Sequence, residues 1–444
     1  MDLPPGPGTL RTLAFVREPF AFLDTCARRY GDWFTVRFPG FHPFVFTSDP
    51  RAVREAFTGD PEQLRAGEAN APLAPFVGAH SLLLLDGAAH HRERLLLLPP
   101  LHGDRMHTHT TTMQRIADDT IDRWPVGRPF AFHPCMRAVT FEVILATVLG
   151  TDEASEDLRQ RLRDCLGRLF AIFGSPIGTL FSIPWTRIDL GPRSPWGRVL
   201  RLRRELDEVL FAELARRRAA GTDRQRDVLS LLLAARDERG VAMTDAAVRD
   251  EVVTLLLAGN ETTAASLAWV MNRLLGRPDV LQALCDELRA GAAQHRSIAD
   301  LPLLDAVVKE TSRLDPVVPN VGRRLATPTR IAEWMLPAGA VLAPCIYLVH
   351  RRPDLWPDAD QFRPERFLDA TPNPHAFFPF GGGPRRCIGA ALATHEMKVV
   401  LRQVLLRCEL APAPGYRARV VRRGIAFAPS EGMPVVMNVR RPVG

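Results

Sequence analysis

Helical periodicity dominates the pattern of apolar and polar positions along this chain. Between about residues 105 and 315 the pattern predicts mostly helices, interrupted by segments with proline and glycine at Gly174–Pro184 and Gly191–Gly197. The arginine-rich stretch Arg198–Arg218 is typical of a solvated amphipathic helix. After residue 315 the sequence is proline-rich and irregular, with one more helix expected after Gly389. The pattern therefore predicts a mainly helical protein.

One predicted helix is unusually long. Thr244 is suited to be its N-cap, and the helix is expected to run to about Leu275, where Gly276-Arg277-Pro278 ends it. At about 1.5 Å per residue, a helix of this length spans roughly the diameter of the protein. Because it is apolar nearly all round, we expect it to cross the core.

A small β region is expected near the N-terminus. Aromatic and β-branched residues at Trp33–Phe38 and Phe44–Phe46 flank the turn residues Pro39-Gly40, a pattern that favours a hairpin. The chain has no internal repeat and no low-complexity linker. We therefore predict one domain over residues 1–444, mainly α with a minor β region, preceded by a short proline-rich segment (residues 1–10).

Composition narrows the class of protein. The 57 lysines and arginines exceed the 50 acids by seven, but the excess is spread along the chain, which argues against a nucleic-acid-binding surface. Seven cysteines, an odd count without a CxxC pair, favour a reducing compartment. The start of the chain does not resemble a signal peptide, and the longest apolar runs noted, such as Val252–Ala258, are far shorter than the ~20 residues of a membrane span. We expect a cytoplasmic monomer without a membrane span.

The most informative segment is Phe380-Gly381-Gly382-Gly383-Pro384-Arg385-Arg386-Cys387-Ile388-Gly389. Three consecutive glycines allow positive φ angles and close approach of the backbone to a flat ligand. Cys387 lies where the loop enters the next helix, so amide N–H groups and the helix N-terminus favour its thiolate. Such an anionic sulfur suits the axial position of a haem iron, and Arg385 suits a haem propionate. The alternative is a glycine-rich turn around an inert, buried cysteine.

This segment closely resembles the haem-binding signature of the cytochromes P450, and the resemblance extends over roughly residues 30–435. It implies the cytochrome P450 fold, with a long central helix over haem b and with Cys387 as the iron ligand. The residues of the segment that the resemblance assigns to cofactor binding are Phe380, Arg385, Cys387 and Gly389.

A second motif precedes this loop. Glu310 and Arg313 stand at i and i+3 on a predicted helix and can form an ion pair, which alone would suggest only a surface pair. Between them and Cys387 lies Phe362–Phe367, which resembles the family's PERF segment. The resemblance implies that Arg366 joins Glu310 and Arg313 in a structural triad that supports the haem loop.

The long helix carries Ala258-Gly259-Asn260-Glu261-Thr262-Thr263, which places a glycine, an acid and two hydroxyls within an apolar helix. The simplest explanation is a kink at which a threonine hydroxyl bonds a backbone carbonyl. The segment also resembles the family's oxygen-activation motif, in which the helix opens over the haem. That resemblance implies that Thr262 hydrogen-bonds the oxygen and that Glu261 relays protons to it.

Cationic residues elsewhere are candidates for the haem propionates. His90 and Arg94, at i and i+4, lie within a segment that resembles the family's DGxxHxxxR pattern, although surface residues would be the default interpretation. The stretch with Arg323 and Arg324 matches a further propionate segment, and its spacing to the Pro337-Ala338-Gly339 turn favours Arg323. Several cationic donors would offset the cost of burying two carboxylates.

The resemblance implies a haem-thiolate monooxygenase that inserts one atom of O2 into a lipophilic small molecule such as a fatty acid, terpenoid or steroid. Its electrons would come from a ferredoxin or flavodoxin with its reductase, docked on a cationic face for which Arg385, Arg386 and Arg402 are candidates. Two alternatives are a peroxide-driven peroxygenase and a non-catalytic haem-binding sensor. The residues expected to line the substrate pocket are Leu257, Ala258, Thr263, Val318 and Val321.

Overall fold

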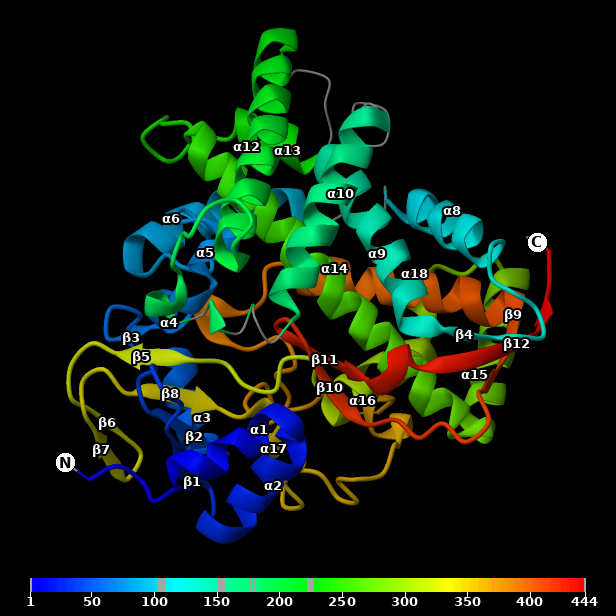
Figure 1. Cartoon of the computed structure of the whole chain (residues 1–444). Helices are drawn as coiled ribbons and strands as arrows, with labels where there is room; N and C mark the ends of the chain where they lie inside the picture. The colour runs from blue at the N-terminus through cyan, green and yellow to red at the C-terminus, as the bar shows by residue number, and fades with distance from the viewer. Residues whose placement is uncertain are drawn as a thin grey trace.

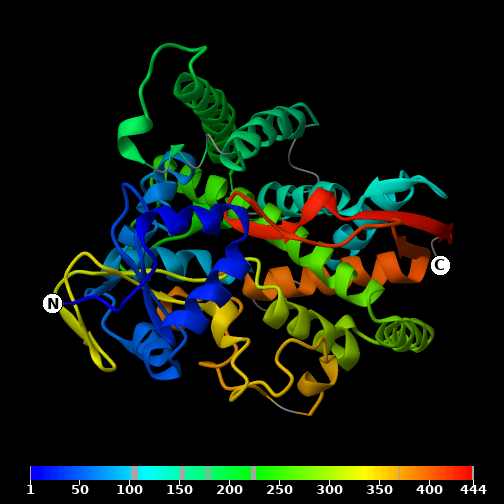
Figure 2. The same ribbon diagram turned by 60° about the horizontal axis from the view of Figure 1, so that its bottom comes forward.

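The computed structural model is organised around one long helix, α14 (Asp245–Leu275). The structure describes residues 2–101, 109–150, 156–175, 178, 180–181, 183–221, 227–369 and 371–442. The predicted helix start is confirmed, because the Thr244 hydroxyl accepts the Ala247 N–H at 3.2 Å and so caps the helix. α14 crosses the middle of the molecule in both ribbon views (Figure 1, Figure 2).

Helices cover α14, with α9 (Phe132–Leu149), α16 (Pro302–Leu314) and α18 (Ala390–Arg407) packed directly against it. The largest hydrophobic core lies among these helices. The mainly α prediction is thereby confirmed. In the described part of the chain, the remaining α-helices are α1 (Ala14–Arg17), α2 (Pro19–Tyr30), α3 (Pro50–Thr58), α4 (Ala66–Ala69), α5 (Ala74–Val77), α6 (Gly87–Leu97), α8 (Thr110–Ile121), α10 (Glu156–Phe173), α12 (Pro195–Ala220), α13 (Val228–Ala234), α15 (Pro278–Ala293) and α17 (Ile346–Val349).

The helix α9 is the most apolar of these packing partners. Within the described ranges it is the one helix that is long and apolar enough to cross a membrane by length and composition. In the fold, however, 72% of this stretch is buried. Its apolar surface is therefore covered by other parts of the protein, as expected of a helix in the core.

Four small sheets make up the β region of the described residues. The first joins β1 (Trp33–Val36), β2 (Phe44–Thr47), β8 (Val341–Pro344), β5 (Arg323–Leu325) and β3 (Leu64–Arg65) in that order. Its β1–β2 pair is antiparallel and turns at Gly40, whose φ is +82°, which confirms the predicted hairpin. The other strands are β4 (Pro129–Ala131), β6 (Thr329–Ile331), β7 (Trp334–Leu336), β9 (Cys408–Pro412), β10 (Val420–Arg423), β11 (Ala426–Pro429) and β12 (Pro434–Arg440).

The prediction that the chain is irregular after residue 315 was wrong. Eight of the described strands, β5 to β12, lie in this part of the chain. Most are three to five residues long, and several pair with distant segments: β8 lies parallel to β2, and β12 lies antiparallel to β4. Strands this short give almost no periodic signal, so their pairing depends on contacts between remote parts of the chain.

The arginine-rich helix α12 is also less solvated than its composition suggests. The guanidinium of Arg217 is fully buried and contacts Glu213 at 2.6 Å and Asp227 at 2.7 Å. It also donates to the Ser230 hydroxyl at 2.8 Å. This paired and hydrogen-bonded arginine ties α12 to the start of α13, so one end of the helix belongs to the core.

Candidate functional site

The glycine-rich loop lies between the segment Pro364–Phe367 and α18. The Cys387 N–H donates to the Phe380 carbonyl at 2.9 Å, and the Gly381 N–H donates to Phe378 at 2.8 Å. Gly381 and Gly383 have φ angles of +69° and +64°, which glycine adopts without strain. The loop is thus a closed turn that ends where α18 begins.

The structure gives a further reason for two of these glycines. A Cβ on Gly382 would clash with the Phe57 ring, and one on Gly383 would clash with the Phe57 backbone. Phe57 lies on α3, so these glycines allow the loop to pack against the protein's own helix. Packing against α3 is therefore a reason for these two glycines that the expected approach to a flat ligand did not include.

All seven cysteines are described, and Cys387 is the one whose side chain is exposed. Crowding by neighbouring protein atoms raises the pKa of its thiol, while a hydrogen bond from the Gly389 N–H and the charges of Arg94 and Arg386 act in the opposite direction. Cys408, the other cysteine near this end of the chain, is buried at the start of β9. Burial raises its pKa to about 12. The accessible sulfur with nearby cationic groups is therefore that of Cys387.

The predicted propionate residues gather into one cationic cluster. His90 on α6 is 5% exposed, and burial, together with Arg385 and Arg94, lowers its pKa to about 3. His90 is therefore neutral at physiological pH and can donate one hydrogen bond. The charge of Arg323 also acts on His90. Four residues from three separate segments thus lie close together.

Arg385 is partly neutralised within this cluster. Its guanidinium contacts the carboxylate of Asp86 and the carbonyl of Leu85, and it donates to the Leu82 carbonyl at 3.1 Å. Asp86 in turn accepts the N–H groups of Gly67 and Glu68. The loop in front of α6 is thereby joined to the cysteine loop.

The structure separates Arg323 from its neighbour Arg324. Arg323 is 5% exposed and lies over the ring of Phe57 at 5.9 Å, and burial lowers its pKa to about 10, with Arg385 contributing. Arg324 instead pairs with Glu68 at 2.8 Å. In the described part of the chain, neither Arg94 nor Arg323 contacts a carboxylate. A site with one buried and one half-buried guanidinium, neither paired with a carboxylate, suits a ligand that carries two carboxylates.

If Arg323 binds a haem propionate, as the resemblance implies, its replacement by leucine should weaken haem retention roughly 10- to 100-fold, because a charged hydrogen-bond donor to a buried carboxylate contributes about 1.5–3 kcal/mol. Arg324→Leu is the matched control, since it breaks only a pair that is one-third exposed. The rate of haem transfer to excess apomyoglobin measures both variants. Equal loss from the two variants would contradict this role for Arg323.

The three predicted triad residues are brought together by α16 and the segment Pro364–Phe367. Arg313 donates to both carboxylate oxygens of Glu310, at 2.7 and 2.8 Å, and Arg366 donates to one of them at 3.1 Å. Glu310 and Arg313 are fully buried. This is a buried, fully hydrogen-bonded ion pair rather than a surface pair.

His350 connects this triad to the cysteine loop. Arg313 donates to the His350 carbonyl at 2.7 Å, and the Nε2 atom of His350 accepts the Phe378 N–H at 3.0 Å. Burial, with the charge of Arg313, lowers the pKa of His350 to about 3, so that the ring remains a neutral acceptor. Phe378 then accepts the Gly381 N–H inside the loop. Sequence analysis missed His350, which lies outside the motifs.

On α14, the Ala258–Thr263 segment remains helical throughout, whereas the resemblance implied an opening. The Thr262 hydroxyl donates to the Ala258 carbonyl at 2.6 Å, which is the simpler arrangement that the sequence suggested. Gly259 lets α9 approach closely, since a Cβ there would lie 3.0 Å from Ile144 Cδ1. Thr140 of α9 donates to the Asn260 side chain at 2.8 Å.

Glu261 contacts α9 rather than open solvent. Its carboxylate lies 2.8 Å from Nε of Arg137 and 3.2 Å from Nε2 of His133. The side chain of Glu261 is 18% exposed and that of His133 is 4% exposed. Sequence analysis did not identify these two partners, because no local pattern links α9 to the acid on α14.

The predicted substrate-lining residues divide into two groups. Leu257 and Thr263 are each 3% exposed, so the structure leaves them almost no surface for a ligand. Ala258, Val318 and Val321 remain half-buried. Val321 faces Gly381 of the cysteine loop, and Val317, at the other end of the same segment, packs near Ala265 of α14. The segment 317–321 therefore runs from α14 to the cysteine loop.

The loop before α6 is held to α14 by buried polar groups. Glu251 accepts the Leu82 N–H at 2.6 Å, and Thr254 donates to the Ser81 hydroxyl at 2.7 Å. Asp250 accepts the His80 N–H at 2.9 Å. Burial raises the pKa of Glu251 to about 8. These hydrogen bonds fix the loop before α6 against α14.

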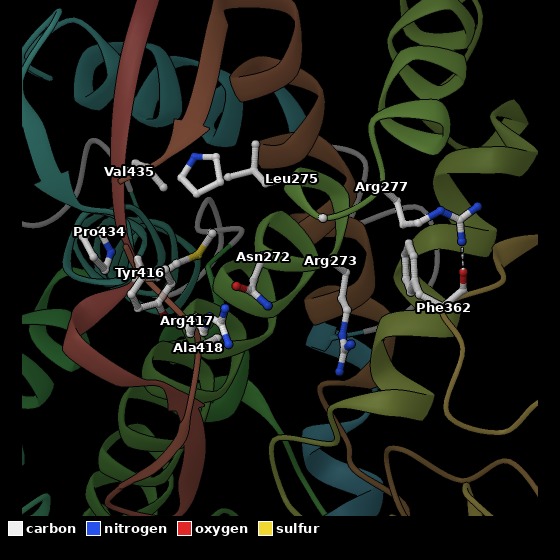
Figure 3. A pocket seen from close by; sticks show the side chains of 13 residues that line it. Asn272, Arg273, Leu275, Arg277, Phe362, Tyr416, Arg417, Ala418, Pro434 and Val435 are labelled. Atoms are coloured by element: carbon white, nitrogen blue, oxygen red, sulfur yellow. Dashed lines mark hydrogen bonds between the residues drawn. The ribbon is translucent and has the colours of Figure 1, made fainter. Parts of the chain in front are cut away.

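A cavity of about 530 Å³ lies at the C-terminal end of α14 (Figure 3). Arg273 there binds both oxygens of Asp315, and Arg277 donates to the Phe362 carbonyl at 2.6 Å. None of the predicted site residues lines this cavity. We therefore assign it no part in the chemistry of the cysteine loop.

Comparisons with known proteins agree on one family. The family model for cytochrome P450 matches residues 4–433. A putative cytochrome P450 135B1 of Mycobacterium tuberculosis is 39% identical, with 100% of this chain and 93% of that protein covered. A putative cytochrome P450 138 of Mycobacterium bovis is 37% identical, with 99% and 97% covered. The structure of retinoic acid-bound cyanobacterial CYP120A1 has a TM-score of 0.85 at 25% identity, with 99% of this chain and 100% of that chain covered.

Proposed function

The chain belongs to the cytochrome P450 family, and on that premise we propose that Cys387 provides the thiolate that binds its haem iron. The family makes the protein a haem monooxygenase. When bound, the haem supplies the iron chemistry that cleaves O2. The observation that carries the choice of Cys387 is its exposed side chain beside the Gly389 N–H and Arg94, in contrast to the buried Cys408.

The cationic cluster supports the same placement of the cofactor. We assign Arg94 and Arg323 to the propionates, because each is a buried or half-buried guanidinium without a carboxylate partner among the described residues. Neutral His90 would add one N–H donor. Arg385 would divide its donors between a propionate and Asp86. Phe380 and Gly389 would form the remainder of the cofactor loop.

Glu261 and Thr262 are proposed as the catalytic pair. They follow Ala258 at i+3 and i+4, so the three residues form one stripe along α14. The Thr262 hydroxyl donates its proton to the Ala258 carbonyl, which leaves its oxygen free to accept a hydrogen bond. Glu261 is the titratable group next to it and would supply protons to this position.

We propose a lipophilic substrate such as a fatty acid, terpenoid or steroid. Ala258, Val318 and Val321 support this class, because they offer apolar, half-buried surface between α14 and the cysteine loop. CYP120A1, the similar cyanobacterial protein, is described as bound to retinoic acid, which is itself lipophilic.

The electron donor is proposed to be a ferredoxin or flavodoxin with its reductase, and the protein to be cytoplasmic. Of the three arginines suggested for docking, Arg386 is exposed and Arg402 is half-buried. Arg385 is 12% exposed and paired with Asp86, so it is removed from the candidates. An acidic donor would be attracted to the two that remain.

Replacing Thr262 by alanine tests the monooxygenase assignment against the two alternatives. With a substrate found by screening lipophilic compounds for a haem spin-state shift, the variant should form roughly tenfold less product and release more hydrogen peroxide. Oxygen from labelled O2 should enter the product of the wild-type enzyme. Turnover that the variant leaves unchanged, and that occurs with peroxide but not with O2 and an electron donor, would instead identify a peroxygenase. Spectral binding without any product would identify a sensor.

A further inference from the structure

The side chain of Glu261 is held by a second helix, and that helix contributes two basic groups. His133 and Arg137 stand at i and i+4 on α9, so they share one face. Each contacts a different oxygen: His133 Nε2 lies 3.2 Å from Oε1, and Arg137 Nε lies 2.8 Å from Oε2. Each carboxylate oxygen of Glu261 therefore has a basic group of α9 next to it.

The packing around this contact leaves the acid little freedom. One turn away on α9, Thr140 bonds Asn260, the residue just before Glu261. A further turn away, Ile144 packs against Gly259, where even a Cβ would be a tight fit. Three successive α14 residues therefore meet three successive turns of α9. Glu261 cannot leave Arg137 by a small shift of either helix.

The contact is an ion pair without well-aligned hydrogen bonds. Glu261 Oε1, His133 Nε2 and Arg137 Nε are all buried, and none has an aligned hydrogen-bond partner in the described part of the chain. The attraction is therefore mainly electrostatic, and the lone pairs of Oε1 remain available to a proton. Arg137 itself is 38% exposed, so its side chain extends from the acid to the surface.

We propose that Arg137 and His133 are positioning residues for Glu261 that fix its carboxylate for proton delivery to Thr262. This inference rests on the proposed function, in which Glu261 relays protons. The reaction takes up one O2, two electrons from the external donor and two protons from water, and yields the oxidised substrate and one water. When delivery to the correct oxygen fails, the same electrons and protons convert O2 to hydrogen peroxide.

The test uses styrene, a small apolar alkene, as the probe substrate and compares the holoenzyme variants with the wild type. A ferredoxin, its reductase and NADH supply the electrons, and styrene oxide and hydrogen peroxide are measured per NADH. We expect Arg137→Ala to lower the yield of styrene oxide per NADH roughly tenfold, with peroxide replacing it. Arg137→Lys should restore part of the yield, because it returns the positive charge without the planar guanidinium. His133→Gln should cause a smaller loss.

A matched control involves another acid of α9. Arg163 of α10 binds Glu142 of α9 at 2.7 Å and is 27% exposed, so Arg163→Ala removes an ion pair to the same helix that does not involve Glu261. This variant should keep the wild-type yield. With added hydrogen peroxide in place of NADH, Arg137→Ala should form styrene oxide at the wild-type rate, because the peroxide already carries both protons.

A readout independent of turnover completes the test. The thermal midpoints of the holoprotein, Arg137→Ala, Glu261→Gln and the double variant should be non-additive, as expected for residues in direct contact. Wild-type yield in Arg137→Ala, equal loss with NADH and with peroxide, or additive midpoints would each overturn the inference. A wild-type enzyme that makes no styrene oxide from either oxidant would count against the proposed function itself.

Discussion

Glu310→Gln should lower the free energy of unfolding by about 3–5 kcal/mol, because it leaves the buried guanidinium of Arg313 without its counter-charge. Arg313 has no route to solvent, since its side chain is fully buried. Its other donors are occupied by the carbonyls of His350 and Ala359, at 2.7 Å each, and these neutral groups cannot replace a carboxylate. Denaturant unfolding of the holoprotein measures the change.

The same substitution should release haem. A chain of hydrogen bonds connects the triad to the cysteine loop. Arg313 donates to the His350 carbonyl, the His350 ring accepts the Phe378 N–H, and the Phe378 carbonyl accepts the Gly381 N–H. Asp286→Asn is the control, because its partner Arg289 is half exposed and such surface pairs contribute about 0–1 kcal/mol. If Glu310→Gln were as well tolerated as this control, the triad would not support the loop.

The parts of the fold that the sequence predicted well have strong local signals. α14 has a capping threonine at one end and a Gly-Arg-Pro stop at the other, so both of its ends are encoded nearby. The β1–β2 hairpin has a glycine at its turn between two aromatic segments. These signals do not depend on what the element packs against.

The features that were missed depend on partners far away in the sequence. Arg217 looked like one of many surface arginines, and only the approach of Asp227 makes it a core residue. His133 and Arg137 contact Glu261 although they are 124 or more positions away in the sequence, and no local pattern marks the contact. The close packing of Gly382 against Phe57, which leaves no room for a Cβ, likewise depends on the position of α3 and has no local sequence signal. The sequence motifs thus predict which segments form the candidate site, whereas the contacts of each residue depend on how remote segments pack together.

The two cysteines near the C-terminus offer the sharpest comparison in the molecule. Cys387→Ser should remove the thiolate ligand, because a serine hydroxyl does not provide the soft anionic sulfur that haem iron takes up in this family. Cys408→Ser should cost some stability through a buried hydroxyl but leave the ligand in place. Both changes replace one sulfur by one oxygen, so differences in side-chain size do not separate them.

The carbon monoxide difference spectrum of the reduced proteins tests this choice most directly. The account predicts the strongly red-shifted Soret band of a thiolate-bound haem in the wild type and in Cys408→Ser, and its loss in Cys387→Ser. A Cys387→Ser protein that retains the red-shifted band, or a Cys408→Ser protein that loses it while still binding haem, would contradict the assignment of Cys387.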